Sequence, residues 1–156
     1  MRRTDRQLTN HESLIDILTR ADCCHLALVD GTRPYIVTMN FGYSWEGEFP
    51  VLYIHGARQG RKIDILSSNP EVCFSMDLDH QLVTGEKACG FGMRYKSLVG
   101  YATASFVDDT EEKGRGLELL LRKFSSAPVF EYDPKVMAVT QVIRLDVTEL
   151  KGKEKP

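Results

Sequence analysis

Residues 51–66, VLYIHGARQGRKIDIL, constrain the fold more than any other segment, because an alternating strand pattern runs directly into a glycine-bearing turn and then a helical pattern. The N–H groups at a helix start have no intrahelical partners and carry partial positive charge, so an anion is stabilised there. Gly56 and Gly60 let the backbone bend and approach a ligand closely. The same turn carries three cations, Arg58, Arg61 and Lys62. The segment therefore predicts a pocket for one phosphate group.

The common phosphate-binding motifs do not fit this turn. A P-loop needs four residues between its glycines and a Lys followed by Ser or Thr, whereas three residues separate Gly56 from Gly60 and Lys62 precedes Ile63. No G-x-G-x-x-G follows any predicted strand, which argues against a dinucleotide fold. A single phosphomonoester fits the turn better. The alternative is a helix start whose arginines only face water.

Size and composition predict one soluble domain. With 156 residues, 42% hydrophobic and 27% charged, the chain fits a single domain over residues 1–150, followed by a polar tail at 151–156 that we expect to fray. A net charge of −2 gives no overall attraction to nucleic acid or anionic lipid. The N-terminal residues contain no apolar stretch, and no segment is long enough to span a membrane. We expect a cytoplasmic protein.

The four cysteines do not have the spacing of a structural metal site. No C-x-x-C occurs, and Cys23 and Cys24 are adjacent. In a reducing compartment we expect free thiols and no metal. Cys73 lies in the apolar run VCFSM, and we expect it in the core.

The first half of the chain alternates between one helix and short strands. Thr9 and Glu12 match a capping box that opens a helix over residues 10–20. CHLALV and PYIVTM flank Asp30 and Gly31, which predicts a hairpin. The expected elements that follow are a strand at 51–55, a helix at 59–67 stopped by Asn69 and Pro70, a strand from 71 to 78 and a long loop at 79–92.

The second half predicts a long strand at 93–107, in which Gly100 marks a bend or a close approach. A helix at 111–124 and a strand within AVTQVIRLDV follow. The result is about six mostly antiparallel strands with two or three helices. We expect a mainly β fold, a small barrel with helices packed outside, and not a doubly wound parallel sheet.

Separate segments occur in an order that points to a known family: PYIVTMNFGY, LYIHGARQGRKIDIL, SNPEVCFSMD, ACGFGMRYKSLVGYATA and VIRLDVTELKGK. They span about residues 2–153. The chain resembles the flavin-binding split barrels related to pyridoxamine phosphate oxidase, and more narrowly their nitroimidazole-resistance branch. In the oxidase proper, substrate residues lie in a C-terminal extension, so we do not expect oxidation of pyridoxamine phosphate here.

The resemblance implies a homodimeric split barrel with FMN at the subunit interface. Arg61 and Lys62 correspond to the pair that holds the FMN phosphate, with Arg58 beside them and His55 and Gly56 lining the same site. The stretch Val37, Thr38, Met39 and Asn40 matches the strand that runs beside the flavin ring. Tyr95 and Ser97 match a strand that contributes to the site from the second subunit.

The resemblance leaves the chemistry to the cofactor, because a flavin carries hydride or electron transfer on its own ring. Asn40 and nearby N–H groups are candidates to stabilise the charge of the reduced ring. His55 is the candidate catalytic side chain, although a structural or cofactor-lining role is the simpler interpretation. A third interpretation is that His55 is an axial ligand of haem, and the adjacent predicted phosphate turn argues against it.

We expect an oxidoreductase that reduces a small acceptor, a nitroaromatic one being the example that the resemblance offers. A protein that binds or sequesters flavin without turnover would need the same pocket. Phe41, Tyr43 and Trp45 also suggest a barrel that stacks single-stranded nucleic acid. The mild acidity argues against that class, and aromatic residues after a strand more often close a barrel end or fill an interface.

Overall fold

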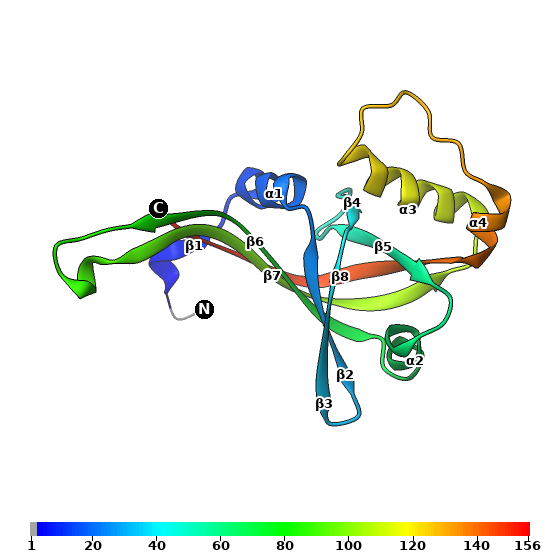
Figure 1. The fold of residues 1–156 in the computed structure, drawn as a ribbon, viewed down its shortest axis with the longest axis horizontal. Helices are drawn as coiled ribbons and strands as arrows, with labels where there is room; N and C mark the ends of the chain where they lie inside the picture. Colours follow the sequence, from blue (N-terminus) through cyan, green and yellow to red (C-terminus); the bar gives the residue numbers. More distant parts are fainter. Residues whose placement is uncertain (1–2) are drawn as a thin grey trace.

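An antiparallel β-sheet forms the body of the protein, and helices lie along it (Figure 1). The computed structural model describes residues 3–156, in which eight strands pair in the order β3-β2-β6-β7-β8-β5-β4, with β1 against β8. The strands are β1 (Gln7–Leu8), β2 (Cys24–Asp30), β3 (Arg33–Met39), β4 (Gly42–Ser44), β5 (Val51–Ala57), β6 (Glu71–Val83), β7 (Gly92–Val107) and β8 (Thr140–Lys155). The antiparallel, mainly β architecture expected from the sequence is confirmed. The expected strands omitted only the two shortest, β1 and β4.

Four α-helices occur in residues 3–156: α1 (His11–Arg20), α2 (Arg61–Ser68), α3 (Thr110–Arg122) and α4 (Pro134–Val139). The predicted Thr9 cap of α1 is wrong, because the side chain of Asn10 accepts the Ser13 N–H at 2.7 Å. Helix α4 is not among the predicted helices. Its start signals, Asp133 as N-cap and Pro134 in the first turn, are present, but six residues are too few to show a helical stripe.

The β6–β7 hairpin is longer than the sequence suggested, and the loop predicted at residues 79–92 is confined to residues 84–91, so the prediction is wrong for residues 79–83 and 92. Strand β6 continues to Val83, and the register with β7 shifts between Leu78 and Gln81. Asp79 has a positive φ of 59° at this irregularity. The bulge breaks the alternation of side chains, which hides the strand in the sequence. The hairpin projects as an arm from the body (Figure 1).

The C-terminus is part of the sheet, so the expected frayed tail is also wrong. Residues 151–155 pair with β7, where Lys155 is opposite Tyr95 and Lys153 is opposite Ser97. Strand β1 pairs with the same stretch from the other side, where Gly152 packs against Leu8. The C-terminal residues are therefore held by β7 on one side and β1 on the other, although their polar sequence does not indicate a strand.

The core fills the inner face of the sheet. Leu26, Phe74 and Ile143 are fully buried there. Gly100 is next to the Phe74 ring and leaves no room for a Cβ, which confirms the close approach expected at this glycine. Cys73 is only half-buried, because it alternates with Val72 and Phe74 and lies on the opposite face, so its predicted core position is wrong. In the described residues, no helix is long and apolar enough to cross a membrane.

Candidate functional site

The predicted phosphate turn joins β5 to α2, and its conformation leaves the helix start open. Gly60 is the N-cap of α2 with φ 123°, a value that favours glycine, and no side chain caps the helix. Its carbonyl accepts the N–H groups of Ile63 and Asp64, at 2.8 and 3.1 Å. The preceding N–H groups, those of Arg61 and Lys62, belong to the first turn, which has no intrahelical acceptor for them. The start of α2 can therefore receive an anion.

Three of the predicted site residues, Met39, Gly56 and Lys62, lie close together around the Lys62 ammonium. Its ammonium is half-buried and lies 3.3 Å from the Met39 sulfur at the end of β3. A Cβ placed on Gly56 would lie 3.0 Å from Lys62 Nζ, so the glycine provides the space that this ammonium occupies. Burial lowers the pKa of Lys62 below its ordinary 10.5. Among residues 3–156, no carboxylate lies within 4 Å of this cation, and a thioether is a weak acceptor. An anionic ligand would compensate the charge.

Arg61, the other predicted phosphate cation, is engaged elsewhere in the structure. Its Nη2 atom lies 2.8 Å from Asp30 Oδ2 at the end of β2, and its guanidinium lies 4.8 Å from the centroid of the Tyr35 ring. It is next to Lys62 in the chain and exposed. The pair therefore shares the helix start, but Lys62 alone is held facing Met39 and Gly56.

His55 immediately precedes Gly56 and points to the other face of β5. Side chains alternate along a strand, and Tyr53, on the same face as His55, packs with Leu117 of α3. Desolvation and then the charge of Lys62 lower the pKa of His55, so the imidazole is neutral at pH 7. The structure places His55 beside the predicted phosphate turn, at a strand position that faces the side of β5 opposite to Gly56.

The β3 residues divide between the two faces of the sheet. Val37 is half-buried against the core, whereas Thr38 is exposed and its Oγ1 lies 3.2 Å from His25 Nδ1. The amide nitrogen of Asn40 donates to the Asp22 carbonyl at 2.9 Å, which fixes the chain after β3. The Asn40 side chain therefore has a structural hydrogen bond that the sequence did not reveal.

Three further predicted site residues, Arg58, Tyr95 and Ser97, do not lie near the Lys62 ammonium. Arg58 lines a separate hollow together with Lys113 and Tyr132. Tyr95 and Ser97 lie in the part of β7 that pairs with the end of β8, on the arm side of the sheet, whereas α2 lies at the other end of it (Figure 1). Within one chain, these two side chains do not meet Lys62.

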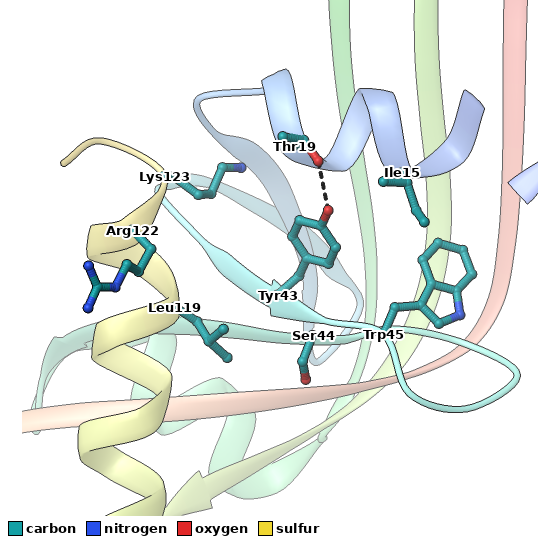
Figure 2. A pocket seen from close by; sticks show the side chains of 8 residues that line it. All are labelled: Ile15, Thr19, Tyr43, Ser44, Trp45, Leu119, Arg122 and Lys123. Atoms are coloured by element: carbon teal, nitrogen blue, oxygen red, sulfur yellow. Dashed lines mark hydrogen bonds between the residues drawn. The ribbon is translucent and has the colours of Figure 1, made fainter. Parts of the chain in front are cut away.

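A hollow beneath α1 lies between that helix, β4 and the end of α3 (Figure 2). The side chains of Thr19, Tyr43 and Lys123 in this hollow are bonded to the protein itself. Thr19 Oγ1 and Tyr43 Oη are 2.7 Å apart, and Lys123 Nζ donates to the carbonyls of Leu18 and Ala21 at 2.9 and 2.6 Å. Lys123 Nζ also lies 3.4 Å from the centroid of the buried Phe41 ring. The Lys123 contacts fasten the end of α3 to the end of α1, and the Thr19–Tyr43 bond fastens α1 to β4.

Sequence reasoning missed Asp30 as the partner of Arg61 and His25 as the partner of Thr38. Each contact joins two different elements. No motif around Asp30 or His25 could have indicated the pairing.

The sequence pattern of the family described as Pyridoxamine 5'-phosphate oxidase matches residues 10–154. The chain belongs to this family. The predicted phosphate turn, β3 and the long hairpin all lie within the matched range. No curated protein matches the chain significantly.

Solved structures share the fold over nearly the whole chain. A candidate 5-nitroimidazole antibiotic resistance protein from Bacteroides thetaiotaomicron is 29% identical, with a TM-score of 0.82 over 95% of this chain and 86% of that one. The flavocytochrome Anf3 from Azotobacter vinelandii is 19% identical, with a TM-score of 0.83 over 100% of this chain and 72% of that one. An FAD-binding protein from Mesorhizobium loti is 20% identical, with a TM-score of 0.67 over 97% and 98%. The split-barrel fold inferred from the sequence is confirmed.

Proposed function

We propose that this protein binds FMN, with the cofactor phosphate at the start of α2, and is an oxidoreductase. The observation that carries the proposal is the half-buried Lys62 ammonium beside an uncapped helix start. Within residues 3–156 its one side-chain hydrogen-bond partner is the Met39 thioether. A phosphate dianion placed there would receive backbone N–H groups and a charge-assisted hydrogen bond from Lys62. Membership of a flavin-binding family supports the identity of the ligand.

The residues present fit a flavin phosphate. Gly56 has no Cβ that would compete with the phosphate for the space around Lys62 Nζ. Arg61 can exchange its exposed ion pair with Asp30 for the phosphate, because such surface pairs are weak. When bound, a flavin supplies hydride or electron transfer through its ring. The protein then binds the cofactor, positions it and excludes water, so no catalytic triad is required.

We propose that the functional unit is a homodimer, in which the second subunit brings Tyr95 and Ser97 to the flavin. The outer face of β3, β2, β6 and β7 supports this, since Ile36, Ala27, Cys73 and Tyr101 follow one another across these strands. Ile36 is 63% exposed and Tyr101 is 52% exposed. A sheet face with exposed large apolar side chains is typical of an interface between subunits.

We infer a small electron acceptor, with nitroaromatic compounds as the first class to test. The support is the likeness, at 29% identity, to a candidate 5-nitroimidazole antibiotic resistance protein. The neutral His55 beside the turn is a candidate to exchange a proton with such a substrate, and a cofactor-lining role remains the alternative interpretation.

The binding test is a titration of the purified protein with FMN, followed by quenching of flavin fluorescence. Lys62→Met should weaken FMN binding by about 1.5–3 kcal/mol, or roughly 10- to 150-fold, because one charge-assisted hydrogen bond is lost. The matched control is Lys151→Met, since Lys151 is exposed and, in the part of the chain that the structure describes, forms its one ion pair with Glu149. Equal affinity of the Lys62→Met and wild-type proteins would place the phosphate elsewhere.

Subunit complementation tests the dimer. A Lys62→Met chain and a Tyr95→Ala/Ser97→Ala chain should each bind FMN weakly alone. Mixed dimers should regain one strong site in two, because the intact Lys62 and the intact β7 then meet across one interface. No recovery in heterodimers isolated with two different tags would contradict the shared site.

Turnover distinguishes an enzyme from a flavin-sequestering protein. The loaded protein is assayed with reduced nicotinamide nucleotides and a panel of nitroimidazoles, nitrobenzoates and quinones. We expect nicotinamide oxidation that depends on the acceptor and is lost in Lys62→Met at low FMN. Binding without turnover of any acceptor would favour sequestration.

A further inference from the structure

The arm, residues 79–94 at the ends of β6 and β7, carries large apolar side chains that face solvent (Figure 1). Leu82 and Met93 are register partners, so their side chains share one face of the arm, and they are 61% and 42% exposed. Both irregularities in the pairing of β7 place the extra residue in the neighbouring strand, so side chains alternate along β7 without interruption. Met93 therefore lies on the same face of β7 as Val99 and Tyr101, which belong to the body of the sheet.

The exposed apolar side chains of this protein are concentrated on one side of the sheet. Eleven large apolar side chains are exposed among residues 3–156. The ones that lie outside β2, β3 and the β6–β7 hairpin are Phe124, Val129, Val136 and Val139. The others form a strip that runs from the outer face of the body into the arm. A continuous apolar strip of this kind is typical of a surface that contacts another protein, and its continuity indicates that one partner covers both parts.

The tip of the arm has a closed, hydrogen-bonded structure. A Cβ placed on Gly85 would lie 2.8 Å from the Cα of Gly90, so the two glycines are in direct contact. Between them lies the 3-10 turn η2 (Ala88–Gly90), in which the Gly90 N–H donates to the Lys87 carbonyl at 2.8 Å. The arm is therefore a defined hairpin that holds its apolar side chains in place and can pack against a second surface.

Symmetry gives the place of the arm in a dimer once the second subunit contributes Tyr95 and Ser97 to the flavin site, so the inference rests on the proposed function. When two copies pack face to face by the same patch, the two-fold axis lies in the plane of the interface. An axis along β7 would set each arm on the partner's arm, far from the partner's Lys62. An axis across the strands sets the arm of one chain on the α2 end of the other, because arm and α2 lie at opposite ends of the sheet (Figure 1). From Ser97, β7 continues five residues to Gly92, or roughly 17 Å, so the arm extends beyond the shared site.

We propose that the arm of each chain lies across the α2 end of a second copy of this chain and covers the flavin site there. Leu82, Phe91 and Met93 are then buried against the partner. Met93 is two residues from Tyr95 on the same face of β7, so of these three side chains it lies nearest to the shared site. Each flavin site is therefore walled by both chains.

Cross-linking with a short bismaleimide tests the position of the arm, and it needs no flavin. Cys89 is exposed at the arm tip and provides one anchor. Ser67→Cys provides the other, on the exposed side of α2. We expect a covalent dimer in Ser67→Cys that is lost when Cys89→Ser is added. Ser126→Cys is the matched control, because Ser126 is exposed and follows α3, which packs on β4 and β5, and it should give no dimer that depends on Cys89.

Met93→Asp tests whether the apolar face of the arm is buried in the dimer. The dissociation constant of the dimer, measured by sedimentation without flavin, should rise about tenfold or more, because a charge would be buried against the partner. The fold of each chain should be unchanged by circular dichroism, since Met93 is exposed in the single chain. Val136→Asp is the matched control, because Val136 is 58% exposed and belongs to α4, outside the sheet, and its dimer should dissociate like the wild type.

Several results would overturn the proposal. A wild-type dimer cross-linked from Cys89 to Cys89 would place the two arms against each other. Equal Cys89-dependent cross-linking of Ser67→Cys and Ser126→Cys, a monomeric wild-type protein, or an unchanged dissociation constant in Met93→Asp would each do the same. FMN titration of the wild-type protein separates the two proposals. Tight FMN binding together with arm-to-arm cross-links would reject the position of the arm alone, whereas absent FMN binding would reject the proposed function.

Discussion

Arg61 at the start of α2 and Asp30 at the end of β2 form an ion pair, with Arg61 Nη2 and Asp30 Oδ2 2.8 Å apart. The pair ties the phosphate turn to the tip of the β2–β3 hairpin. Both side chains are about half exposed, at 50% and 43%, so the pair contributes little to stability. It does hold a cation one residue away from Lys62. A phosphate must compete with Asp30 for Arg61.

Asp30→Asn should therefore raise FMN affinity. Freeing Arg61 from an exposed pair is worth about 0.2–1 kcal/mol, a gain of up to roughly fivefold. Fluorescence titration measures it, and the gain should vanish in the Arg61→Ala background, since the two residues act through one contact. A gain of the same size in that background would mean that Asp30 acts by general charge alone.

Gly56 variants test the space around Lys62. Gly56→Val should lower FMN affinity at least tenfold, because branched methyl groups would displace the ammonium, which lies 3.0 Å from the position of a Cβ. Gly56→Ser should bind FMN as tightly as the wild type or a few-fold tighter, because its hydroxyl adds a donor to the phosphate. Affinity that falls equally in both variants would exclude this contact.

FMN binding should depend on pH in a way that riboflavin binding does not. Affinity should rise between about pH 5 and 7 as the phosphate loses its second proton. It should fall again as pH approaches the lowered pKa of Lys62, below 10.5, because the anion binds the protonated ammonium. Riboflavin has no phosphate and is the matched ligand. Parallel pH profiles for the two flavins would show that Lys62 does not bind the FMN phosphate.

Ile36→Glu tests the outer sheet face as the dimer interface. A charge at a 63% exposed position should not unfold the chain, but it would be buried between two subunits. We expect a monomer by light scattering, with weaker FMN binding. Val129→Glu is the control, because Val129 is 73% exposed and outside the sheet, and should remain dimeric. A dimeric Ile36→Glu protein would rule out this face.

Gly100→Ala should lower the free energy of unfolding by about 2 kcal/mol, since a methyl group would overlap the Phe74 ring and the Glu149 carbonyl. Gly114→Ala in α3 is the matched change, because its Cβ would meet no atom within 4 Å. That variant should gain about 0.5–1 kcal/mol from helix propensity. Urea unfolding measures both, and equal stabilities would contradict the packing at Gly100.

The parts of the site that could be predicted are contiguous in the chain. Gly56, Gly60 and Lys62 lie within one strand, turn and helix, whose local preferences fix their relation. The termini of the long strands could not be predicted in the same way. Residues 79–83 and 151–155 are too polar and irregular to indicate strands, and they are ordered by pairing with residues far away in sequence.

The sequence alone determined the antiparallel class, the family and the cationic helix start, because alternation, turn chemistry and helix-end electrostatics act over a few residues. Only the tertiary structure decided which of the three cations is available to bind an anion at the start of α2. It set Lys62 against Met39, paired Arg61 with Asp30 and turned Arg58 toward Lys113 and Tyr132. These partners come from other strands and helices, and the direction of a long, flexible side chain depends on the neighbours that folding brings to it.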